Sequence, residues 1–157
     1  MGNWLSGLMV KQRSHWLPAS NGYVHEGAVN ASTEDSPRYV IRVNHNGNWI
    51  PGELIPDEGV AYICDGGAAH RYKTYEVLVD CNSKWVKASK GRIDKAADAI
   101  TAGVNAHRDF YIGRVKHEGH VRIGKVVPGI GCIIPDGEEE LVLQSYEVLV
   151  CENDILY

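Results

Sequence analysis

Two kinds of side chain in this sequence could do chemistry on a ligand, namely carboxylates and imidazoles. Asp35 and Glu53 form an acidic pair, and glycoside hydrolysis needs two carboxyl groups at a set separation. His45 and His117 could act as acid–base groups or metal ligands, because imidazole titrates near neutral pH. Neither histidine has further ligands nearby in an HxH or HExxH spacing. We therefore expect both to be turn histidines that bond to backbone.

Motifs of the common enzyme classes are missing from the sequence. It contains no GxSxG, no phosphate-binding P-loop and no Rossmann fingerprint, and no Cys–His pair recurs along it. The sequence therefore predicts a binding protein rather than an enzyme, with no metal and no cofactor. A glycoside hydrolase that uses the paired carboxylates is the less favoured alternative.

Composition and charge exclude several classes of partner. The chain has 157 residues, 44% hydrophobic and 23% charged, which is typical of one compact globular body. A formal charge of −4 and the absence of a Lys/Arg stripe argue against nucleic acid. No apolar run approaches the ~20 residues that cross a bilayer, and no secretory signal is recognisable. We expect a protein that is cytoplasmic, or secreted without an ordinary signal peptide.

The four cysteines are widely spaced and include no CxxC pair, which argues against a zinc cluster. Without a signal peptide, reduced thiols are the expected state. The cysteines are Cys64, Cys81, Cys132 and Cys151.

The dominant feature of the sequence is an internal duplication with a period of roughly 70 residues. Three blocks occur twice in the same order: residues 16–22 return as 85–91, 39–47 as 111–119, and 75–79 as 146–150. The duplication predicts a leader at 1–15, a first repeat at 16–81 and a second repeat at 82–157. The apolar leader is expected to add a strand or to mediate dimerisation.

Short strands separated by glycine turns are predicted throughout. Glycines recur at 47/119, 52/124 and 59/131, where the chain should turn, because glycine tolerates positive φ or close backbone approach. Between them, segments such as 38–43 and 139–144 are β-branched or aromatic and partly alternate. Residues 92–101 are expected to form a loop or a short turn. The predicted fold is all-β, with two tandem repeats of antiparallel strands related by a pseudo-twofold axis and sharing one core.

The repeated charged residues suggest a scaffold within each repeat. Arg42 and Arg114 lie mid-strand, and each is expected to form a salt bridge across the sheet to the glutamate of the Tyr-Glu-Val-Leu strand. These glutamates are Glu76 and Glu147.

Four motifs of the second repeat, partly present in the first, resemble the DM-nine repeat family. They are Tyr-Ile-Gly-Arg-Val-Lys-His-Glu-Gly at 111–119, Gly-Lys-Val-Val-Pro at 124–128, Ile-Pro-Asp-Gly-Glu-Glu-Glu at 134–140 and Tyr-Glu-Val-Leu at 146–149. The resemblance covers about residues 16–151. It implies a small β-sheet protein, and some members of the family are mannose-binding lectins that act in pattern recognition.

The resemblance also implies which residues hold the sugar. In the second repeat these are Lys125, a loop partner that is Asn105 or Asp109, and Glu140. The chemistry fits, because pyranose hydroxyls both donate and accept hydrogen bonds and so favour an ammonium beside a carboxylate or amide.

The first repeat departs from the family pattern. Glu53 stands where the lysine belongs, its loop carries Glu34 and Asp35, and its later corner at 65–69 has no Lys–Glu pair. Asp35 and Glu53 are therefore the only candidates for a sugar site in this repeat.

The sequence as a whole predicts a lectin that binds mannose-type glycans of microbes in innate immunity. Dimerisation as a homodimer would raise its avidity. The main alternative is an intracellular protein-interaction scaffold of the same fold whose sugar sites have decayed.

Overall fold

The structure is a computed structural model that describes residues 4–5, 8–9, 13–32, 34, 36–93 and 96–155. Asp35, a predicted site residue, and Val10 of the leader lie outside the described residues. Among the described residues no helix is long and apolar enough to cross a membrane. The elements are β1 (Trp4–Leu5), β2 (Leu8–Met9), β3 (His15–Ser20), β4 (Tyr39–His45), β5 (Asn48–Ile55), η1 (Pro56–Glu58), β6 (Val60–Asp65), β7 (Ala68–Tyr72), β8 (Thr74–Val79), β9 (Ser83–Ser89), β10 (Tyr111–His117), β11 (His120–Val127), β12 (Gly131–Asp136), β13 (Glu139–Leu143), β14 (Ser145–Cys151) and η3 (Glu152–Asp154).

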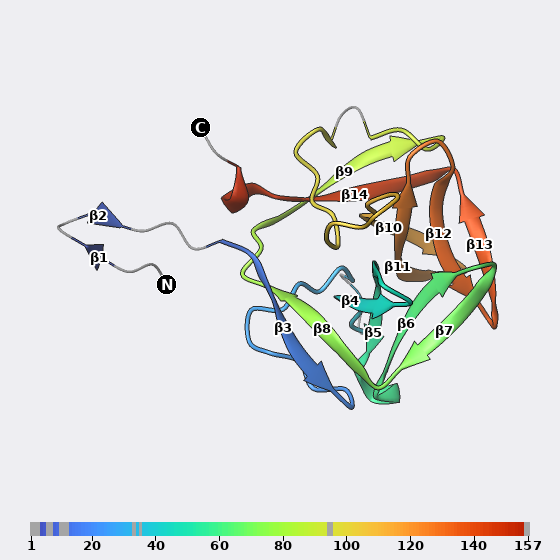
Figure 1. The fold of residues 1–157 in the computed structure, drawn as a ribbon, viewed down its shortest axis with the longest axis horizontal. Helices are drawn as coiled ribbons and strands as arrows, with labels where there is room; N and C mark the ends of the chain where they lie inside the picture. Colours follow the sequence, from blue (N-terminus) through green and yellow to red (C-terminus); the bar gives the residue numbers. More distant parts are fainter. Residues whose placement is uncertain are drawn as a thin grey trace.

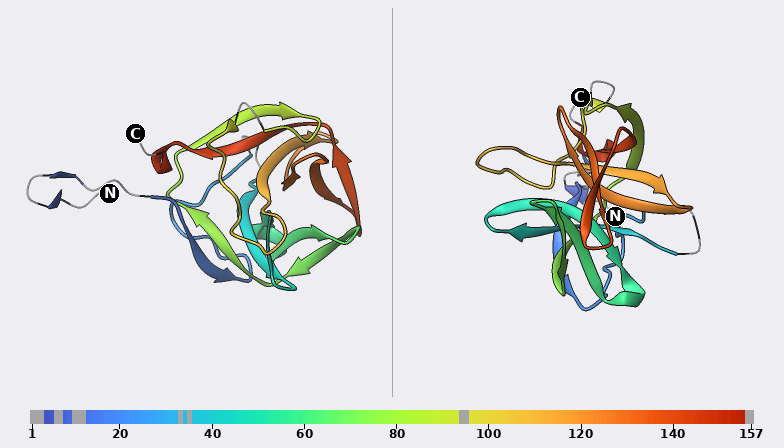
Figure 2. Two further views of the ribbon diagram at one scale, coloured as in Figure 1. Left: turned by 45° about the horizontal axis from the view of Figure 1, so that its top comes forward. Right: turned by 90° about the vertical axis from the view of Figure 1, so that its right-hand side faces the viewer.

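The all-β prediction is confirmed. Twelve strands form one antiparallel sheet in the order β3-β8-β4-β5-β6-β7-β13-β12-β11-β10-β14-β9. Read from its two ends, β3 to β7 and β9 to β13, the sheet has the same order of strands in each half. The halves meet where Ala68 of β7 pairs with Glu139 of β13. Figure 1 shows the sheet curled round so that β9 to β14 lie above β3 to β8, and Figure 2 shows the halves stacked.

Among the described residues the core has one cluster in each half and two drawn from both, the smaller of which is Cys64, Val127 and Ile133. The first cluster includes Ile41, Ile50 and Ile63, and the second is built around strands β10 to β14. The third joins Val40 and Leu78 of the first half to residues such as Ile112, Ile123 and Leu149 of the second. Burying these branched side chains away from water on folding is the main source of stability. The pseudo-twofold axis stays a prediction. β1 pairs with β2.

Gly52 and Gly124 lie within strands β5 and β11, so the prediction that the chain turns at these two positions is wrong. A Cβ at Gly52 would lie 1.9 Å from the Tyr62 carbonyl oxygen, and one at Gly124 would lie 2.1 Å from that of Ile133. Close approach of the neighbouring strand therefore explains these two glycines. Gly47 and Gly119 do lie in turns, with φ of 86° and 80°.

The predicted salt bridges are confirmed in both halves. The Arg42 guanidinium lies 2.7 Å from the Glu76 carboxylate, and that of Arg114 lies 2.9 Å from Glu147. Residues 92–101 contain a short turn, as expected, in which the Ala99 N–H donates to the Ala96 carbonyl.

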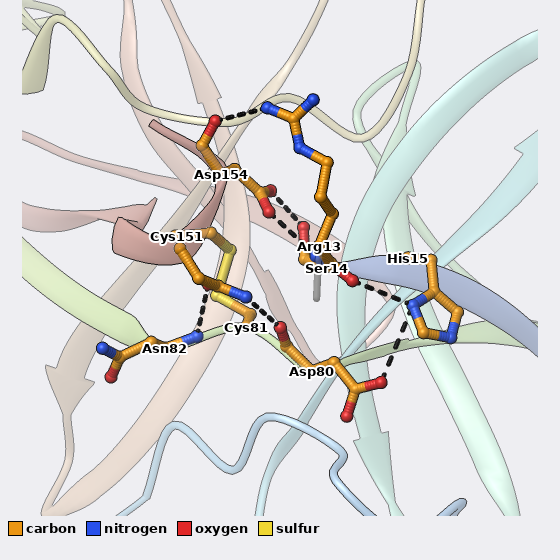
Figure 3. Close-up of a disulfide and its surroundings, with 9 residues drawn as sticks. Arg13, Ser14, His15, Asp80, Cys81, Asn82, Cys151 and Asp154 are labelled. Carbon is orange, nitrogen blue, oxygen red and sulfur yellow. Dashed lines mark hydrogen bonds and ion pairs between the residues drawn. A yellow bond between two sulfur atoms is a disulfide. The ribbon is translucent and has the colours of Figure 1, made fainter. Parts of the chain in front are cut away.

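The prediction of four reduced thiols is wrong, because Cys81 and Cys151 form a disulfide. Cys81 follows β8, and Cys151 ends β14, so the bond links the end of the first half to the end of the second. Figure 3 shows how the chain is fastened around it. The Ser14 N–H donates to the Asp154 carboxylate, and the Asn153 amide donates to the Asp80 carbonyl. The disulfide thus lies where three segments meet: the start of β3, the link between β8 and β9, and η3 after β14.

Thiol counting is expected to separate the two kinds of cysteine. Cys64 and Cys132 are free and buried, and burial raises the pKa of each thiol to about 12. Because the thiolate is the reactive form, Cys64 and Cys132 should hardly react with a thiol reagent while the protein is folded. Unfolding without reductant should expose two thiols, and unfolding with reductant four. Four thiols without reductant would show that Cys81 and Cys151 are not bonded.

Candidate binding site

Lys125 lies in the middle of β11, where it pairs with Ile112 on one side and Ile133 on the other. Residues on both sides of it are buried, since β11 crosses the centre of the protein. The Lys125 side chain is only 7% exposed. Its ammonium lies 4.8 Å from the centre of the Phe110 ring and 4.0 Å from the Asp65 carboxylate. Within the described part of the chain it donates no hydrogen bond, so its three donors are available to a ligand.

Glu140 lies on β13, the strand that joins the second half to the first. Its Oε1 is buried and accepts no hydrogen bond from the residues that the structure describes. A buried acceptor without a donor costs free energy, and such atoms are rare in native proteins unless a ligand or water satisfies them.

Lys125 and Glu140 both act electrostatically on the same buried cysteine. Burial raises the pKa of Cys64, the Glu140 carboxylate raises it further, and the Lys125 ammonium lowers it. Both charges therefore act on one thiol in the middle of the protein. Lys125 and Glu140 are the residues predicted as the ammonium and the carboxylate of a sugar site, and both act on this thiol.

The first half contributes Asp65, which the sequence did not mark as a ligand. One Asp65 oxygen faces Lys125, and the other lies 3.4 Å from His45 Nε2. His45 Nδ1 is 2.5 Å from the Tyr72 hydroxyl, and its ring lies 4.4 Å from that of His70. The prediction that His45 bonds to backbone is therefore wrong. The candidate site is built from both halves, with Asp65 held between an ammonium and an imidazole.

His117 also departs from its prediction. Its Nε2 lies 3.7 Å from the Glu118 carboxylate, and the described residues give it no bond to backbone.

Asn105 and Asp109 position the loop that carries Phe110. The Asn105 amide accepts from the Trp49 N–H at 2.7 Å and donates to the carbonyls of Trp49 and Arg108 at 3.1 and 3.0 Å. Asp109 accepts from the Asn105 N–H at 2.7 Å. The two Asn105 bonds to Trp49 fix this loop of the second half onto the β4–β5 hairpin of the first, and the bond to the Arg108 carbonyl closes the loop on itself.

Replacing Asn105 with alanine is expected to lower the free energy of unfolding by about 1–3 kcal/mol. The substitution leaves the Trp49 N–H and carbonyl without their partner. Urea unfolding measures the change, and His107→Ala, at an exposed position in the same loop, is the control. Equal stability of the two variants would show that the Asn105 contacts do not hold the loop.

Glu53 occupies in β5 the place that Lys125 has in β11, and it is completely buried. Its carboxylate accepts from Arg122 Nε and Nη2, each at 2.9 Å, and from the Ile123 N–H at 2.9 Å. Burial raises the pKa of Glu53, and the Arg122 guanidinium opposes that rise. Both oxygens are engaged, which leaves Glu53 poorly placed to bind a sugar hydroxyl or to act as a nucleophile.

Comparisons with known proteins identify the family of this chain and a solved structure with a similar fold. The family model described as the DM9 repeat matches residues 32–143 and again 106–157. No curated protein matches the sequence. A solved structure, the nematode sperm cell motility protein MFP2B, is similar with a TM-score of 0.65 at 20% identity. The similarity covers 87% of this chain but 46% of that one, and at this identity it shows the fold alone. From the family match, this chain belongs to the DM9 repeat family.

Proposed function

We propose that this protein is a carbohydrate-binding lectin whose site lies between Lys125 and Glu140. The observation that carries the proposal is the buried Glu140 Oε1, which lacks a donor while a nearly buried ammonium without hydrogen bonds acts on the same cysteine. A pyranose would satisfy both groups. One hydroxyl donates to the carboxylate, and its neighbour accepts from the ammonium. The Phe110 ring offers an apolar surface beside them.

Mannose-type sugars are the proposed ligands, because some lectins of the DM-nine family bind mannose. Sugar binding needs no metal ion in this scheme, because the Lys125 ammonium supplies the positive charge. The proposed function involves no catalysis. Binding of microbial glycans would serve innate immunity, with dimerisation raising the avidity of a weak single site. Of the two predicted localisations, the Cys81–Cys151 disulfide favours secretion into an oxidising compartment.

A glycan panel followed by calorimetric titration with mannose tests this function. Binding is expected at about millimolar dissociation constants, because hydroxyl recognition at one site gains little over water. The heat should be unchanged by a chelator. No binding across the panel, together with capture of a protein partner, would instead support the interaction scaffold.

A further inference from the structure

A cavity lies between the two halves, away from the candidate site, and Lys125 does not line it. It has a volume of about 310 Å³, near the lower end of the range for small-molecule sites. Its polar lining comes from both halves: Arg38, Glu58 and Tyr62 from the first, and His117, His120 and Arg122 from the second.

Arg38 has an unsatisfied edge. Its Nη1 donates to the Ser36 hydroxyl at 3.1 Å and to the Pro37 carbonyl at 3.3 Å. Its Nε is buried and has no hydrogen-bond partner within the described ranges of the chain. Among the described residues no carboxylate forms an ion pair with Arg38, so its Nε edge needs an acceptor.

Three other arginines of this chain show what such an edge binds. Each holds a carboxylate at the Nε and Nη2 edge of the guanidinium: Arg114 and Arg122 contact both carboxylate oxygens, and Arg42 contacts one. The distances are 2.8 and 2.7 Å for Arg42 with Glu76, 2.9 and 3.4 Å for Arg114 with Glu147, and 2.9 and 2.9 Å for Arg122 with Glu53. Arg38 is a guanidinium of the same kind whose Nε has no carboxylate.

The acidic residues around the cavity are already engaged. Glu58 accepts a hydrogen bond from the Tyr62 hydroxyl at 2.5 Å, and Glu118 lies beside His117. Both oxygens of Glu53 are taken by Arg122 and by backbone. Among the described residues none of these carboxylates pairs with Arg38, so a carboxylate on a ligand would complete its Nε edge.

We propose that this cavity binds a small acidic saccharide, a hexuronate, with its carboxylate side-on to Arg38. The rings of His117 and His120 lie at the β10–β11 turn and offer nitrogen atoms for the sugar hydroxyls. Arg122, which lines the cavity, neutralises the buried Glu53, the counterpart of Lys125. The cavity presents the guanidinium of Arg38 instead of an ammonium. The proposal does not depend on sugar binding at Lys125.

Calorimetric titration of the full chain with D-glucuronate, glucose and acetate tests the proposal. Glucuronate should bind, and glucose and acetate should bind at least about tenfold more weakly, because each lacks part of the ligand. Arg38→Gln and Arg38→Lys should both weaken glucuronate binding by at least about tenfold, since neither keeps the fork. Arg108→Gln removes one positive charge, as Arg38→Gln does, but at an exposed position, and it should leave glucuronate binding intact. Lys125→Met should also leave glucuronate binding intact.

Two results would overturn the proposal: glucuronate that binds no better than glucose, or Arg38 variants that are folded and bind normally. Acetate that binds as well as glucuronate would refute the saccharide. NMR of the unmodified protein gives an answer even if the variants fail to fold. The His117 and His120 ring signals should shift with glucuronate and stay in place with glucose. Failure of mannose binding alone would refute the Lys125 site and leave this one standing.

Discussion

Mannose binding is expected to weaken by roughly 10- to 100-fold when Lys125 is replaced by methionine, because a hydrogen bond from a charged donor contributes about 1.5–3 kcal/mol. Methionine keeps most of the length and apolar volume of the side chain and removes the ammonium. The fold should survive, since a buried ammonium costs free energy to desolvate. Calorimetric titration of the variant with mannose measures the loss.

Lys116→Met is the matched control for this loss. The Lys116 side chain is 68% exposed and pairs with Glu34 at 3.1 Å, away from the buried cluster. Lys116→Met removes the same charge as Lys125→Met, but outside the candidate site, so mannose affinity should be preserved. A Lys125→Met protein that binds mannose as well as Lys116→Met would remove Lys125 from the site.

Replacing Arg122 with methionine is expected to lower the free energy of unfolding by about 3–5 kcal/mol, because it leaves the fully buried Glu53 carboxylate without its counter-ion. The pKa of Glu53 is already raised by burial, and loss of Arg122 raises it further. A carboxyl whose folded pKa is raised loses stability as the pH rises from its ordinary pKa through the folded one. The deficit should therefore be largest near neutral pH and shrink in acid. Urea unfolding at several pH values measures it.

Two further variants make this result specific. Glu53→Gln combined with Arg122→Met removes the buried charge and should recover much of the lost stability. Arg114→Met breaks the ion pair with Glu147, whose side chain is 32% exposed, and should cost clearly less because water can solvate that carboxylate. An equal cost for Arg114→Met and Arg122→Met would contradict the assigned role of burial.

The strands could be predicted from the sequence because local signals specify them. Segments such as 38–43 and 139–144 have the β-branched and aromatic composition of strands and became β4 and β13. Gly52 was misassigned to a turn, because sequence does not distinguish a glycine that turns from one that lets a neighbouring strand approach.

The disulfide was missed for a different reason. Cys81 and Cys151 are separated by 70 residues, and they meet only because the linker after β8 returns beside the end of β14. Nothing in the spacing of the cysteines specifies that closure.

The candidate site starts from residues that the family motifs indicate. Lys125 and Glu140 follow from those motifs, and both act on the buried thiol of Cys64. Asp65 was missed because it belongs to the other repeat and approaches Lys125 only through the packing of the two halves. Asn105 was proposed as a sugar ligand, but its amide bonds to Trp49 of the other half. The sequence of one repeat does not show which residues of the other repeat it will contact.

An NMR titration of the ¹⁵N-labelled protein with mannose tests the central claim most directly, because it locates the bound sugar without any substitution. The lectin site between the two halves predicts saturable shifts of the backbone amides of Phe110, Lys125 and Glu140, unchanged by a chelator. Shifts confined to other parts of the protein, or none with mannose in large excess, would contradict it.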